Sequence, residues 1–90
     1  MATVNHFEEL EAWKLSRKLC KKIGVLIKEG RFEKNYRFVH QVEGSSGSIM
    51  DNIAEGFERG MRKEFIQFLG FSKGSCGELR SQLYRALDKN

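Results

Sequence analysis

The stretch that decides the fold lies in the middle of the chain, where residues 35–58 read NYRFVHQVEGSSGSIMDNIAEGFE. Apolar or small side chains recur there in steps of three, four, three, four and four residues, which places them on one face of a helix. These positions are Val39, Val42, Ser46, Ile49, Ile53 and Phe57. The spacing therefore predicts a long helix over about residues 35–59.

Five small residues in the centre of this stretch, Gly44-Ser45-Ser46-Gly47-Ser48, leave two interpretations open. Their composition is that of a flexible linker, which would divide the helix into two pieces. Against division, the heptad spacing passes through them without a shift, and glycine costs a helix only about 1 kcal/mol per position. We favour a continuous helix whose small residues let another helix cross closely. A leucine in place of Ser46 or Gly47 is then expected to disrupt packing.

Two further helices are predicted on either side, over about residues 7–29 and 62–88. Asn5 or His6 is placed to start the first of them, and Gly30 supplies a left-handed stop. The apolar face of the third helix is broader than contact with two neighbours requires, which predicts association with further copies of the chain.

Two groups of small residues are expected to shape the contact between the second and third helices. Gly56 and Gly60 bracket the turn between them, and Gly56 is expected to cap the second helix. The residues Gly74-Ser75-Cys76-Gly77 are placed to face the small residues of the second helix.

The chain as a whole has 90 residues and no proline, which favours a few long helices joined by short turns. Hydrophobic residues make up 40% and charged residues 31%, a balance too apolar for a disordered chain. We expect one domain, residues 1–90, of the all-α class: an up-and-down antiparallel helix bundle with three long helices. No apolar run approaches the roughly 20 residues of a membrane span, and no signal peptide is recognisable. A cytoplasmic protein without a membrane partner is expected.

Several short motifs together resemble a known family. They are Gln41, Ser48-Ile49, Asn52-Ile53-Ala54-Glu55-Gly56, Lys63-Glu64-Phe65 and Gly74-Ser75 with Glu78, preceded by Phe7-x-x-Leu10-x-x-Trp13. This set is similar to the signature of the four-helix-bundle proteins encoded in 23S rRNA intervening sequences, and it covers nearly all of the chain. The resemblance implies a four-helix up-and-down bundle that assembles into a ring-shaped homopentamer. It also implies kinship with the accessory protein of diversity-generating retroelements, a basic ring that contacts a reverse transcriptase and nucleic acid.

The chain departs from that family in two places. The family usually carries two arginines after the segment containing Gln41, where this chain has Glu43-Gly44. A basic surface built by those arginines is therefore not expected here. The family also has a fourth helix, whereas this sequence reaches Asn90 after three. Two interpretations are open: the last helix lies outside this sequence, or the chain is a shortened member of the family. Three helices alone would leave an apolar groove that favours association.

No arrangement of residues typical of an enzyme is present in the sequence. His6 and His40 lack the Glu-x-x-His partner of a di-iron bundle, and the glycines lack phosphate-loop spacing. Cys20 and Cys76 are expected to be buried thiols, with a disulfide between them as the alternative. We therefore expect no catalytic residue, no metal and no cofactor.

Two polar pairs share the spacing i, i+3: Asn52 with Glu55 on the second helix, and Ser75 with Glu78 on the third. One interpretation is a polar binding site between the helices. The interpretation that we favour is a hydrogen-bonded network that fixes helix register, because buried polar groups need partners. Asn52 and Glu55 are accordingly expected to be largely buried.

The strongest functional indication is a basic face on the first predicted helix. The net charge is +4, and cations gather opposite the apolar stripe of that helix. The candidate phosphate contacts are Lys14, Arg17, Lys18, Lys21 and Lys22. Since the pattern contains no aromatic stacking platform, binding to RNA or DNA is expected to be directed at the backbone and tolerant of sequence. The alternatives are a solvated lysine-rich surface and a protein-interaction module whose oligomer docks a protein partner.

Overall fold

A computed structural model describes residues 3–32 and 35–89 of the chain. Its elements are the 3-10 turn η1 (Phe7–Glu9) and the helices α1 (Glu11–Lys28), α2 (Tyr36–Glu58) and α3 (Arg62–Asp88). The all-helical class is thereby confirmed, and the described residues include no strand.

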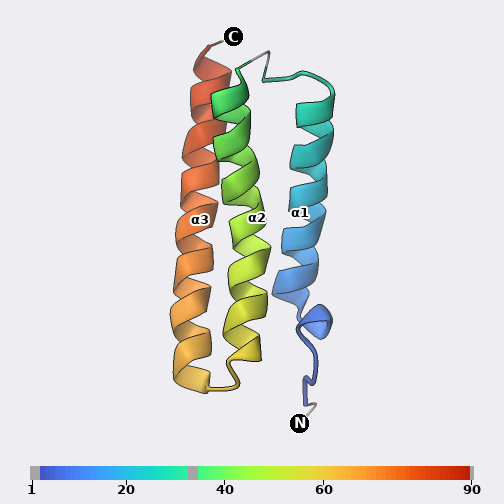
Figure 1. The fold of residues 1–90 in the computed structure, drawn as a ribbon, viewed down its shortest axis with the longest axis vertical. Helices are drawn as coiled ribbons and strands as arrows, with labels where there is room; N and C mark the ends of the chain where they lie inside the picture. The colour runs from blue at the N-terminus through green and yellow to red at the C-terminus, as the bar shows by residue number, and fades with distance from the viewer. Residues whose placement is uncertain (1–2, 33–34, 90) are drawn as a thin grey trace.

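The three helices lie side by side along the long axis of a molecule that measures 48 × 20 × 18 Å (Figure 1). The chain reverses direction at both connections, so the end of α1, the start of α2 and the end of α3 lie together. α2 contacts both of the other helices, whereas no Cα atom of α1 lies within 8 Å of a Cα atom of α3. α2 is therefore the central helix of the three.

The start of α1 differs from the sequence prediction. Leu10 is extended, with φ −73° and ψ 127°, so the residues before it form η1 and not the first turn of an α-helix. His6 precedes η1 without a hydrogen bond from its side chain, and the Asn5 backbone N–H donates to Glu9 Oε1 at 3.4 Å. This break turns the Phe7 ring edge-on against Trp13, with ring centroids 5.1 Å apart.

The end of α1 is the left-handed stop that the sequence predicts. Gly30 has φ 72°, and its N–H donates to the Ile27 carbonyl at 3.0 Å. The Arg31 N–H donates to the Leu26 carbonyl at 3.1 Å. These two bonds form a Schellman motif, which satisfies carbonyls of the last turn.

α2 is continuous through its glycine- and serine-rich centre. The Asn35 side chain caps its first turn by accepting from the Phe38 N–H at 3.1 Å. Ser46 lies in the core, but a Cβ atom at Gly44 or Gly47 would meet nothing within 4 Å. The prediction that Gly47 lies in a close helix crossing is therefore wrong, because the serines face the neighbouring helices and the glycines face outward.

The close approach between α2 and α3 occurs at Gly56. A Cβ atom there would lie 2.5 Å from Phe68 Cβ and 3.2 Å from Phe65 Cδ1. The prediction that Gly56 caps α2 is wrong, since α2 continues to Glu58. Gly60, with φ 76°, provides the left-handed turn that leads into α3.

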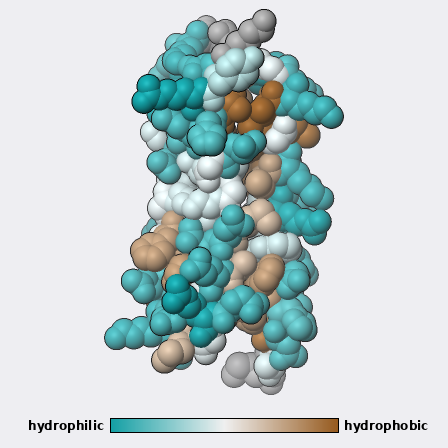
Figure 2. Space-filling model, in the orientation of Figure 1, coloured by the Kyte–Doolittle hydropathy of each residue, from teal (hydrophilic) through white to brown (hydrophobic). Residues whose placement is uncertain are grey.

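The core is a narrow cluster of side chains contributed by all three helices and the α1–α2 connection. Its buried members are Ile23, Phe32, Phe38, Val42, Ile49 and Leu79. Cys76 packs at its margin, and the Cys20 Sγ atom lies 3.9 Å from Ser46 Oγ. Both are free thiols, but they are half-buried and not fully buried as predicted. On the face shown in Figure 2, hydrophobic atoms form a broken band flanked by hydrophilic ones. Within the described ranges, no helix is both long and apolar enough to cross a membrane.

Candidate nucleic-acid interface

A groove of about 380 Å³ lies along the exposed side of α1, at its junction with η1. The side chains that line it are Glu8, Trp13, Lys14, Arg17, Lys18 and Lys21. Positions 17, 18 and 21 share one helix face with position 14, because they follow it by three, four and seven residues. Lys22 is exposed as well, but it lies about 40° beyond Lys18 round the helix and does not line the groove. Four of the five candidate cations are thus brought together.

The positive charge of this groove is only slightly compensated. Lys14 Nζ lies 3.5 Å from Glu11 Oε1, an exposed pair that contributes little to stability. Among the ion pairs of the described residues, none involves the other four candidate cations. Glu8 is the one acidic side chain in the lining. An anion that enters the groove therefore meets a local excess of positive charge.

An aromatic ring stands within the basic groove, which the sequence analysis missed. Trp13 is half-exposed, and the Arg17 guanidinium lies 5.7 Å from the centre of its ring. Trp13 appears in the sequence analysis only as the last residue of the Phe7-x-x-Leu10-x-x-Trp13 motif. The i, i+4 spacing of Trp13 and Arg17 is the sequence signal that predicts this contact. The expectation that no aromatic platform accompanies the cations is corrected accordingly.

The second candidate set, the polar pairs on α2 and α3, forms part of a ladder of hydrogen bonds between these helices. The Ser75 hydroxyl donates to Ser48 Oγ at 3.0 Å, and the Ser72 hydroxyl donates to the Ile49 carbonyl at 2.7 Å. Asn52 donates to Ser48 Oγ and to the Ser48 carbonyl, both at 2.9 Å. Asn52 is half-buried and not largely buried as predicted. Among the hydrogen bonds of the described residues, it is linked to α3 only through Ser48.

The two glutamates of the polar pairs differ in their surroundings. Glu78 accepts a hydrogen bond from the Ser45 hydroxyl at 3.1 Å and so extends the ladder. Glu55 does not join it, because its side chain is 57% exposed and pairs with Arg59 at 3.0 Å. The prediction that Glu55 is largely buried is wrong. Ser45, Ser48 and Ser72, which sequence reasoning did not select, form the connections.

The whole of this surface falls within a recognisable family sequence. The sequence model described as 23S rRNA-intervening sequence protein matches residues 8–90, which include the basic groove and the α2–α3 ladder. The chain belongs to this family. No curated protein and no solved structure matches this chain. The family resemblance inferred from short motifs of this intervening-sequence protein is thus confirmed over residues 8–90.

The described residues of this family member include no cluster of three or more histidine, cysteine, aspartate or glutamate side chains that could hold a metal ion. The groove on α1 supplies N–H donors on flexible stems and one aromatic face, a combination suited to phosphate and to a base stacked beside it.

Proposed function

We propose that this 23S rRNA-intervening sequence protein is a non-enzymatic, homo-oligomeric helical-bundle protein that acts in the cytoplasm and binds the backbone of RNA or DNA. The observation that carries the proposal is the groove on α1, where four exposed cations surround Trp13. Lys14, Lys18 and Lys21 supply point charges to phosphate oxygens. Arg17 supplies a planar donor that is held against the Trp13 ring.

Phosphate contacts of this kind release counterions, so the affinity should fall as salt rises and should depend little on sequence. Replacing Lys14, Lys18 and Lys21 together with glutamine removes three contacts without touching the core, since all three are exposed. For duplex DNA, the slope of log affinity against log salt should become shallower by about 2.7 per bound copy. Fluorescence anisotropy with a structured RNA and with a DNA duplex, over a salt series, measures this slope.

A matched variant controls for the general loss of charge. Arg62, Lys63 and Lys73 are exposed on α3, away from the groove, and their replacement by glutamine removes the same charge. We expect this control to retain most of the wild-type affinity. If the groove variant binds as tightly as the wild type, or if both variants lose affinity equally, the assignment to α1 is wrong.

Self-association is the second part of the proposal. α3 carries large apolar side chains that no helix of this chain covers: Ile66, Tyr84 and Leu87 are each more than half exposed. Such a surface favours burial against further copies. By family resemblance we propose a homopentamer of up-and-down antiparallel bundles. Light scattering at micromolar concentration tests this, and a particle of 10.4 kDa, the mass of one chain, contradicts it.

The alternative function is that of a protein-interaction module whose oligomer docks a protein partner. A hollow of about 300 Å³ on α3, lined by Arg80, Leu83, Tyr84 and Leu87, favours it. An exposed tyrosine and leucines beside an arginine are typical of protein interfaces. Absence of RNA and DNA binding at low salt, together with an intact oligomer, would decide for this alternative.

A further inference from the structure

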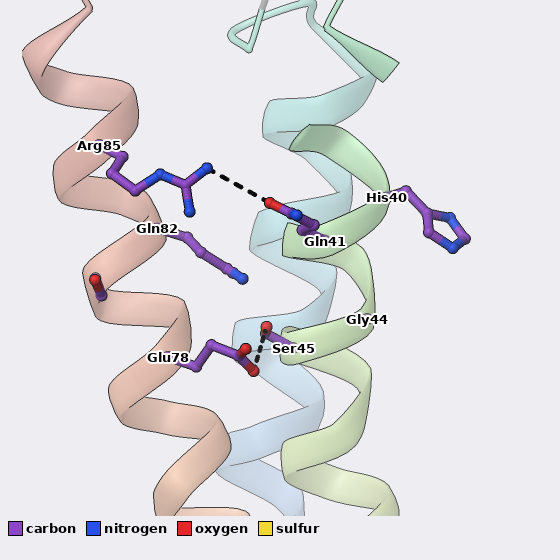
Figure 3. Close-up of a pocket in the computed structure, with 8 residues that line it drawn as sticks. His40, Gln41, Gly44, Ser45, Glu78, Gln82 and Arg85 are labelled. Carbon is purple, nitrogen blue, oxygen red and sulfur yellow. Dashed lines mark hydrogen bonds between the residues drawn. The ribbon is translucent and has the colours of Figure 1, made fainter. Parts of the chain in front are cut away.

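A second hollow, of about 480 Å³, lies between α2 and α3 near the end of the molecule where α3 terminates (Figure 3). It is separate from the basic groove, and its lining is polar and includes Gln41, Gly44, Ser45, Glu78, Gln82 and Arg85. Gln41 and Glu78 are among the motif residues of the family resemblance, but the resemblance assigns no ligand to this hollow and the proposed function does not use it. Three features of its lining point to one class of ligand.

The first feature is a buried hydrogen-bond acceptor without a partner. Gln82 is only 5% exposed, and its side chain extends from α3 into the space between the two helices. Its Oε1 atom is buried and accepts no hydrogen bond from any described residue. Buried side-chain oxygens almost always have a donor. Because the terminal torsion of glutamine is broad and roughly two-fold, rotation about it can exchange the nitrogen that faces the hollow in Figure 3 for this oxygen.

The second feature is a carboxylate without a cation. Glu78 lies one helical turn from Gln82 and accepts one hydrogen bond, from the buried Ser45 hydroxyl. Among the ion pairs of the described residues, none includes Glu78. Arg85 also lines the hollow, but its guanidinium donates to Gln41 Oε1 at 3.5 Å and lies 5.1 Å from the Phe38 ring centre. Figure 3 shows Arg85 and Glu78 directed to different positions on α2.

The third feature is the space itself. Gly44 forms part of the wall, and a Cβ atom built on it would meet nothing within 4 Å. A glycine inside a helix costs stability relative to alanine, and no close contact within this chain requires one here. The open wall gives a ligand access to the Glu78 carboxylate and to the Gln82 amide from the solvent side.

We propose that this hollow binds a guanidinium group. A guanidinium is planar and carries five N–H donors, so it can span an anionic acceptor, Glu78, and a neutral one, Gln82 Oε1. The positive charge would compensate Glu78, and an N–H would supply the donor that Gln82 lacks. The group can come from a small free guanidine or from an arginine side chain on another polypeptide, since the recognition chemistry is the same.

The test is an NMR titration of the full chain with ethylguanidinium chloride. We expect saturable shifts of the Gly44 and Ser45 amides and of the Gln82 side-chain NH₂ group, with a Kd on the order of 10 mM for so small a ligand. Tetramethylammonium, which has the charge but no N–H group, should produce no saturable shift. Equal binding of tetramethylammonium, or no saturation with ethylguanidinium, overturns the proposal.

Variants locate the site. Because Glu78 is exposed, Glu78→Gln should fold normally, and it should weaken binding by about tenfold or more, since it removes a charge-assisted hydrogen bond. Gly44→Met should close the hollow, whereas Gly47→Met, one turn away and outside it, should bind like the wild type. Wild-type affinity in Glu78→Gln, or equal loss in the two methionine variants, overturns the assignment.

Two further ligands identify the source of the group. Tighter binding of N-acetyl-arginine methylamide than of agmatine supports the site and assigns it to an arginine of a polypeptide. The reverse order supports the site and assigns it to a free guanidine.

Discussion

Replacing Gly56 with alanine adds one methyl group where α2 and α3 nearly touch. The new Cβ atom would lie 2.5 Å from Phe68 Cβ, and contacts of this kind are ordinary only at 3.4 Å or more. Phe68 Cβ is bonded directly to the α3 backbone, so rotation of the ring cannot relieve the clash. The two helices must therefore separate locally by about 0.9 Å, a distance that follows from the same two values.

The size of the effect follows from this separation. Overpacking of a closely packed contact costs about 1–3 kcal/mol. If the shift spreads along the interface, the bond from the Ser72 hydroxyl to the Ile49 carbonyl lengthens from 2.7 Å to beyond hydrogen-bonding range, which costs about 1 kcal/mol more. Alanine recovers about 1 kcal/mol of helix propensity. We expect Gly56→Ala to lower the free energy of unfolding by about 1–3 kcal/mol.

Urea unfolding followed by circular dichroism measures this change, at one fixed protein concentration because association alters apparent stability. Gly47→Ala is the matched control, since its Cβ atom enters open space and only the propensity gain remains. That variant should be more stable than the wild type by about 0.5–1 kcal/mol. If Gly56→Ala is as stable as Gly47→Ala, the close approach of α2 and α3 at this point is wrong.

Four further substitutions test the packing, the polar ladder and the left-handed stop of α1 by the same unfolding assay. Ser46→Leu should lower stability by about 1–3 kcal/mol, because Ser46 is 1% exposed and the core has no room for the added volume; an unchanged midpoint would contradict this. Asn52→Ala should lower the free energy of unfolding by about 1–2 kcal/mol, because it removes the bonds to Ser48. Glu55→Ala should change it by less than about 0.5 kcal/mol, since the pair with Arg59 is exposed. Equal effects of the two substitutions would contradict the ladder. Gly30→Ala should lower the free energy of unfolding by about 1–2 kcal/mol, because alanine is strained at φ 72°. A variant as stable as the wild type would show that α1 does not end in this left-handed stop.

Much of the fold could be predicted because helix formation is governed by local spacing. The α2 periodicity continues through Gly44–Ser48 without a shift, and the structure forms one helix there. The left-handed stop at Gly30 depends on the conformational freedom of one residue, which is also local information. The exposure of Lys14, Arg17, Lys18, Lys21 and Lys22 follows in the same way, since a helical period places them opposite the apolar stripe.

The tertiary structure decided which neighbour each helix face meets. Periodicity assigns a residue to a face but gives no distance to the next helix, so Gly47 and Gly56 look equivalent in the sequence. Across the interface, one faces open space and the other lies against Phe68. Glu55 and Glu78 likewise share a spacing and are both exposed, but their partners differ. Glu78 accepts from the buried Ser45 hydroxyl of the adjacent helix, whereas Glu55 pairs with Arg59 of its own helix. The break at Leu10 that turns Phe7 against Trp13 also depends on packing, because η1 contacts α2 as well as α1 and the helical period of the sequence does not report such contacts.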